Sequence, residues 1–142
     1  MVQSVTARRS PSPARRAVVR AQKERLIAEL GTDRDPIVGL AERGSALVLS
    51  LAGELDLYNA PALREALQDA VARSPERLVV DLAEVTFIDS TALGALVEAR
   101  SQLRDGGAFA LAAPGLEVRR ALEVSGLDRH FAVHETIETA IE

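Results

Sequence analysis

Two adjacent hydroxyl residues, Ser90 and Thr91, lie at the position in the sequence where a chemically modified site is most readily expected. They follow the β-branched run at residues 78–82 and precede an apolar-periodic segment over residues 93–103. This pattern predicts a buried strand that leads into a helix. The first N–H groups of a helix lack an intrahelical acceptor and carry partial positive charge, so the backbone would hold an added phosphate there. Ser and Thr are also common at helix N-caps. The spacing alone therefore does not distinguish a modified residue from a plain N-cap at Ser90 or Thr91.

Two carboxylates offer a second kind of chemistry. Asp56 and Asp89 each follow an apolar, strand-like run, so neighbouring strands would bring them to one edge of a sheet. Paired carboxylates can perform acid–base catalysis or bind Mg²⁺. Neither aspartate has a nucleophile and a base beside it. Isolated aspartates at the start of a loop are more commonly helix caps or solvated side chains. His130 and His134 flank a short predicted strand, so we interpret them as surface histidines and expect no metal site and no cofactor.

Composition narrows the class of protein. The 142 residues suffice for one domain, and with 47% hydrophobic but only 3% aromatic residues its core must be aliphatic. The absence of cysteine excludes disulfides, thiolate zinc sites and cysteine nucleophiles. No apolar run approaches the roughly 20 residues that cross a bilayer, and the N-terminus lacks the apolar core of a secretory signal. We therefore expect a soluble cytoplasmic protein without membrane insertion.

Charge divides the chain into two parts. Residues 1–35 carry eight Lys or Arg and four Asp or Glu, whereas residues 36–142 carry nine and 17. We predict a basic flexible extension over residues 1–35, partly helical around residues 18–30, and a separate acidic domain over residues 36–142. The extension has no aromatic residue for stacking on bases, which favours a solvated tail over direct nucleic-acid binding.

The domain's pattern predicts strands alternating with helices. A short turn at residues 43–45 should pair the first two strands antiparallel, and helical connections should make the later strands parallel. Asn59 is expected to cap the first helix of the domain. The predicted strands cover residues 37–40, 46–51, 77–82, 108–112 and 131–133, and the helices residues 60–73, 91–104, 115–124 and a short segment from residue 136. The fold class is thus α/β, a single domain with a mixed, mostly parallel sheet of four to five strands and about four helices.

One stretch is specific to a known family. Residues 78–94, which contain Val-Val-Asp-Leu and then Phe-Ile-Asp-Ser-Thr-Ala-Leu-Gly, resemble the signature of the STAS domain of bacterial anti-sigma-factor antagonists. Gly-Glu-Leu-Asp at residues 53–56 and Ser-Gly-Leu-Asp at residues 125–128, with Phe131, resemble further elements of that domain in the same order. The resemblance covers residues 36–142 and implies the STAS fold.

The resemblance also implies a role in transcription regulation and stress response. In this family the unphosphorylated domain binds an anti-sigma-factor kinase and frees a sigma factor; the kinase then phosphorylates a Ser or Thr directly after an Asp-Ser pair. A metal-dependent Ser/Thr phosphatase reverses the modification. The position that matches the acceptor is Thr91, with Ser90 as second choice, and we expect a phosphoprotein that is not an enzyme and is a monomer or weak dimer. The residues expected to bind the partner are Asp56, Asp89, Ser90, Thr91, Ala92 and Leu93.

The sequence departs from the family pattern at two positions. Antagonists commonly have serine at the acceptor and glycine after it, where this chain has Thr91 and Ala92. Threonine can be phosphorylated, whereas alanine stiffens the start of the helix. The alternatives are therefore a STAS subunit of a lipid transport or stress-signalling assembly that is not switched, and, third, a small enzyme that uses Asp56 and Asp89.

Overall fold

The structure is a computed structural model that describes residues 35–103 and 107–142. These residues belong to one compact unit, residues 34–142. The predicted basic extension and its helix lie outside the described residues, apart from Asp35.

The described residues form a five-stranded sheet with the strands in sequence order. β1 pairs antiparallel with β2 across a turn at Gly44, whose φ of +63° is a conformation that glycine adopts readily. The pairs β2–β3, β3–β4 and β4–β5 are parallel, as the alternation of strands and helices predicts. The strands are β1 (Ile37–Arg43), β2 (Ala46–Leu55), β3 (Arg77–Ile88), β4 (Ala108–Ala112) and β5 (Ala132–His134).

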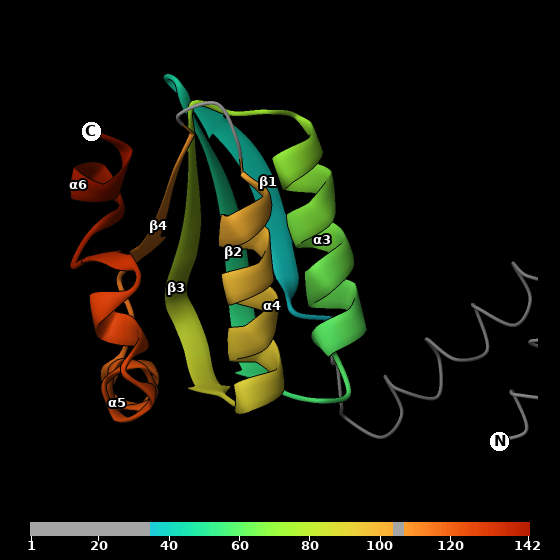
Figure 1. Cartoon of the computed structure of the whole chain (residues 1–142), viewed down its shortest axis with the longest axis vertical. Helices are drawn as coiled ribbons and strands as arrows, with labels where there is room; N and C mark the ends of the chain where they lie inside the picture. Colours follow the sequence, from blue (N-terminus) through green and yellow to red (C-terminus); the bar gives the residue numbers. More distant parts are fainter. Residues whose placement is uncertain (1–34, 104–106) are drawn as a thin grey trace, which may run out of the picture. The chain divides into compact units, whose positions relative to one another are not determined.

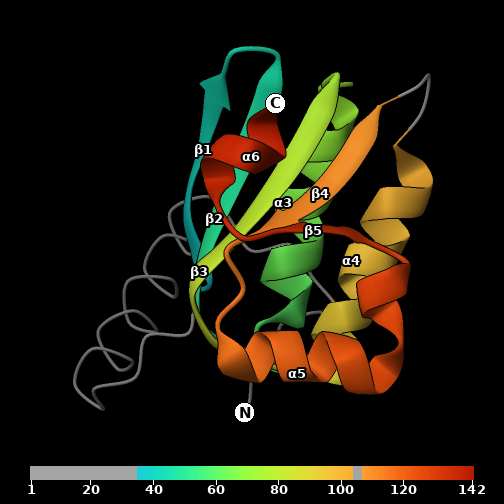
Figure 2. The same ribbon diagram turned by 90° about the vertical axis from the view of Figure 1, so that its left-hand side faces the viewer.

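Helices cover both faces of this sheet. α3 and α4 lie side by side against one face, α6 packs on the other, and α5 packs against β3 (Figures 1 and 2). The predicted fold class is confirmed, and the one helical element not predicted is a short 3₁₀ turn after α5. The helices are α3 (Ala60–Ala72), α4 (Ser90–Gln102), α5 (Leu116–Ser125) and α6 (Ile137–Ile141), and the 3₁₀ turn is Leu127–Arg129.

The core follows the two-residue period of the strands. In β2, Leu47 and Leu49 join the larger cluster under α3 and α4, while Ala46 and Val48 face α6. Leu78, Val79 and Val80 of β3 have no exposed surface, so the central strand is buried on both faces. The buried residues of the two central helices are Leu63, Leu67 and Ala70 of α3 and Ala92, Leu93, Ala95, Leu96 and Ala99 of α4.

β3 is longer than predicted, because it continues to Ile88 rather than ending near Leu82. Beyond Leu82 only Val85 and Ile88 are buried, a spacing of three rather than two. The cause is two irregularities in the pairing of β2 with β3, one of them at Gly53, which has a φ of +82°. These bulges break the alternation that identifies a strand in a sequence.

Leu96 offers a test of this packing. It has no exposed surface in α4, so Leu96→Ala should lower the free energy of unfolding by about 2–5 kcal/mol, because it leaves a cavity. Denaturation by guanidinium chloride measures the change. The matched control is Leu116→Ala in α5, where the side chain is 69% exposed and the stability should stay within about 0.5 kcal/mol. Equal losses in the two variants would contradict the assigned core.

Candidate functional site

The candidate site lies where β2 and β3 end together. Leu55 at the end of β2 pairs with Ile88 at the end of β3, and the amide of Asp89 donates to the carbonyl of Leu55 at 3.0 Å. Asp56 and Asp89 directly follow these paired residues. The structure therefore brings both aspartates to one edge of the sheet, as the sequence pattern predicts.

Asp89 begins helix α4. Its Oδ1 accepts a hydrogen bond from the amide of Ala92 at 3.0 Å, and its carbonyl accepts from the amide of Leu93, also at 3.0 Å. A carboxylate at this position also interacts favourably with the positive end of the helix dipole. Asp89 is thus the N-cap, and interpreting Ser90 or Thr91 as the cap is wrong.

Ser90 and Thr91 are consequently the first two residues of the helix. The Ser90 side chain is exposed and Thr91 is half-buried. Amides in the first helical turn have no acceptor within the helix, so donors remain next to both hydroxyl groups. The predicted acceptor therefore lies at the surface, at the positive end of a capped helix.

The next two predicted partner-binding residues face inward. Ala92 has no exposed surface and Leu93 is 7% exposed, and both belong to the main core cluster. They can contribute little side-chain area to a partner surface. The methyl group of Ala92 points into the core, so it leaves the surface around Thr91 unobstructed.

Asp56 organises the loop between β2 and α3. Its Oδ1 accepts hydrogen bonds from the amides of Tyr58 at 3.0 Å and Asn59 at 3.3 Å. The Asn59 side chain accepts from the amide of Asp56 at 2.9 Å and donates to the carbonyl of Glu54 at 2.7 Å. These four bonds make residues 56–59 a closed turn fixed to the end of β2.

Asn59 therefore differs from its predicted role. It occupies the N-cap position of α3, but its side chain makes no capping hydrogen bond and points back to β2. Its burial, with 6% of its surface exposed, explains why both ends of its amide are hydrogen bonded.

Charge at this edge has one sign. Residues 53–63 and 84–97 contain four carboxylates and no Lys or Arg. A surface that complements this edge therefore carries positive charge. The carboxylates are those of Glu54, Asp56, Glu84 and Asp89.

The part of the chain that the structure describes gives little indication of a metal site. No three His, Cys, Asp or Glu side chains there group as metal ligands. His130 contacts Arg100, with 3.4 Å between Nε2 and Nη1, and packs edge-on against Phe131, so the histidine takes part in surface packing. Asp56 and Asp89 both accept hydrogen bonds from backbone amides, which gives each a structural role.

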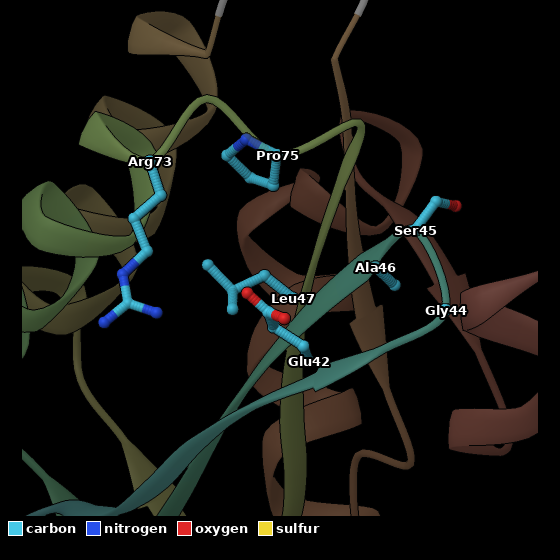
Figure 3. A pocket seen from close by; sticks show the side chains of 7 residues that line it. All are labelled: Glu42, Gly44, Ser45, Ala46, Leu47, Arg73 and Pro75. Atoms are coloured by element: carbon cyan, nitrogen blue, oxygen red, sulfur yellow. The ribbon is translucent and has the colours of Figure 1, made fainter.

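A shallow pocket lies at the opposite end of β2, beside the β1–β2 turn (Figure 3). Its lining includes Glu42, Leu47, Arg73 and Pro75, and none of the predicted site residues. The charged side chains of Glu42 and Arg73 are exposed. The pocket therefore lacks the buried polar group expected of a built ligand site.

Comparison with known proteins identifies the family. The model of the STAS domain matches residues 38–140. The chain belongs to the STAS domain family. The anti-sigma-F factor antagonist RsfB of Mycobacterium tuberculosis is 36% identical over 73% of this chain and 85% of that protein. The anti-sigma-B factor antagonist of Listeria monocytogenes is 40% identical over 54% of this chain and 68% of its own length.

Solved structures agree with this assignment. The crystal structure of an anti-sigma factor antagonist from Mycobacterium paratuberculosis has a TM-score of 0.72 and 34% identity, and covers 77% of this chain and 94% of that one. A putative antagonist from Thermotoga maritima has a TM-score of 0.68 and 28% identity, and covers 72% and 90% of the two chains. The predicted STAS fold and antagonist family are confirmed. The relatives and solved structures compared above are named as anti-sigma factor antagonists, which agrees with the prediction that the chain is not an enzyme. No helix of the described residues is long and apolar enough to cross a membrane.

The cap of α4 can be tested directly. Asp89→Ala removes the acceptor for the Ala92 amide, so the free energy of unfolding should fall by about 0.5–2 kcal/mol, whereas Asp89→Asn keeps an acceptor and most of the stability. Urea denaturation measures both. Asp69→Ala, at an exposed position within α3, is the control and should cause no loss. An Asp89→Ala variant as stable as the control would show that the cap contributes nothing.

Proposed function

We propose that the protein binds an anti-sigma-factor Ser/Thr kinase in its unphosphorylated form, frees a sigma factor, and is switched off when the kinase phosphorylates Thr91. The observation that carries the proposal is the place of Thr91. It is a surface-accessible hydroxyl residue in the first turn of a helix that Asp89 caps, in a chain of the antagonist family. RsfB and the Listeria relative are both named as antagonists of anti-sigma factors.

The start of α4 can accommodate a phosphate within the domain itself. A phosphoryl group adds about −1.5 to −2 charges at neutral pH. The amides and dipole at the start of α4 offset part of that charge, because the amides of Ser90 and Thr91 come before Leu93, whose amide makes the first backbone hydrogen bond of the helix. Ala92 and Leu93 stay in the core and need not move. Phosphorylation should therefore leave the fold intact.

A partner that packs closely against α4 cannot accept a phosphate on Thr91. Thr91 is half-buried, so a surface that packs against α4 must lie close to its hydroxyl. A phosphoryl group fills that space and brings charge that the partner would have to desolvate. A loss of about 3 kcal/mol at the interface lowers affinity roughly 100-fold, which suffices for a switch.

Ser90 remains the second choice as acceptor. Its side chain is more exposed than that of Thr91, so a kinase could reach it readily. The family pattern that the sequence resembles has its acceptor directly after the Asp-Ser pair, and this favours Thr91. We further propose that a metal-dependent Ser/Thr phosphatase restores the active form, that the protein acts in the cytoplasm, and that it is a monomer or weak dimer.

Mass spectrometry distinguishes this proposal from a STAS subunit that is not switched. The protein is incubated with ATP and, separately, with each anti-sigma-factor kinase of the source organism, and phosphorylated peptides are mapped. We expect phosphate on Thr91 with at least one kinase. Phosphate on Ser90 alone would move the acceptor, and no phosphate with any kinase would favour a subunit of a transport or stress-signalling assembly.

Binding of Thr91 variants to that kinase tests the switch itself. Thr91→Ala should keep the affinity of the unmodified protein, whereas Thr91→Glu should lower it about 100-fold, because the added carboxylate imitates the charge and bulk of a phosphate. Pull-down followed by calorimetric titration measures both.

The control is Ser45→Glu. Ser45 is exposed in the β1–β2 turn, at the end of β2 opposite Asp56, so the same charge added there should not change binding. Equal binding by Thr91→Ala and Thr91→Glu would contradict the switch.

A further inference from the structure

We propose that Leu57 and Tyr58, on the loop between β2 and α3, are the apolar anchor by which the protein holds the anti-sigma-factor kinase. The inference rests on the proposed function and names a second part of the same interface. It assigns the affinity to the loop and the on–off control to Thr91.

Exposed apolar side chains gather at the edge that carries Thr91. Leu57 is 63% exposed, Tyr58 is 75% exposed, and Phe87, the last residue but one of β3, is 46% exposed. Phe87 pairs with Glu54 at the end of β2, directly before the loop. Side chains this exposed contribute little to the core, and exposed apolar residues on neighbouring segments are typical of an interaction surface.

The loop presents these side chains in a fixed conformation. Asp56 accepts from the amides of Tyr58 and Asn59, and the buried Asn59 side chain fixes the loop to Glu54 and Asp56. A loop ordered before binding loses less conformational entropy when the complex forms. Tyrosine is among the residues that dominate binding energy at interfaces, because a rigid ring buries a large area. Exposure and rigidity thus coincide at Tyr58.

The charges around the loop indicate the chemistry of the partner. Glu54, Asp56, Glu84 and Asp89 each lie within three residues of Leu57 or Phe87 in the sequence, and no Lys or Arg occurs in residues 53–63 or 84–97. The complementary surface is an apolar pocket with Arg or Lys at its rim. The anti-sigma-factor kinase is therefore the partner that we expect to bind this loop. Its apolar pocket should lie next to the cleft that delivers phosphate to Thr91.

The loop and the acceptor belong to different elements. Residues 56–59 are fixed by their own hydrogen bonds to β2, whereas Thr91 lies in α4. Loss of the anchor should therefore weaken association without changing the transfer of phosphate once the complex has formed.

The test uses the whole 142-residue chain and the kinase that phosphorylates Thr91. Tyr58→Ala should raise the Kd and the KM for phosphorylation about tenfold or more, leave kcat within about twofold, and keep Thr91 as the modified residue. Leu57→Ala should act in the same direction, and Tyr58→Phe should keep the affinity because the anchor is apolar. All three variants should match the unfolding midpoint of the unmodified protein.

Val124→Ala is the control, since Val124 is 84% exposed on α5 and should not affect binding. Unchanged Kd and KM in Tyr58→Ala, while Thr91→Glu still loses binding, would overturn the anchor and leave the switch standing. A fall in kcat alone would overturn it too, and so would a loss of self-association at unchanged kinase affinity, because the surface would then join two copies. If Thr91→Glu binds like the unmodified protein, the proposed function itself fails.

Discussion

The parallel pairing of β2 with β3 is the constraint on which the candidate site depends. The pairing runs to Leu55 and Ile88, and the hydrogen bond from the Asp89 amide to Leu55 continues it past the end of the strands. Because parallel neighbours end at the same edge of a sheet, this pairing places the β2–α3 loop beside the start of α4. The exposed residues Leu57 and Tyr58 and the proposed acceptor Thr91 thereby belong to one edge of the sheet although they are far apart in sequence.

Helix α4 separates buried from exposed side chains at its start. Ala92, Leu93 and Leu96 are buried, while Ser90 and Thr91 lie at the surface less than two turns away. A phosphate on the outer face therefore requires no rearrangement of the core. A modification that leaves the fold unchanged but alters the surface is suited to repeated addition and removal, since the cost falls on the partner interface.

Much of the fold could be predicted because its signals are local. The short turn before Ala46 indicates antiparallel pairing, and helical connections make the later strands parallel. The end of β3 was missed because the bulges with β2 replace the two-residue period. The role of Asn59 could not be predicted, because asparagine before a helix can either cap that helix or hydrogen bond back to the preceding strand. In the structure its side chain donates to the carbonyl of Glu54 in β2. The exposed pair Leu57 and Tyr58 carries no periodic signal, so only its exposure in the structure reveals it.

The most direct test of the switch compares the protein before and after modification by its own kinase. Protein phosphorylated stoichiometrically at Thr91 and unmodified protein are each titrated into the kinase in the presence of ADP, and the Kd is measured by calorimetry. Our account predicts that phosphorylation raises the Kd about 100-fold or more while circular dichroism of the free protein stays the same. Equal Kd values for the two forms would contradict the account.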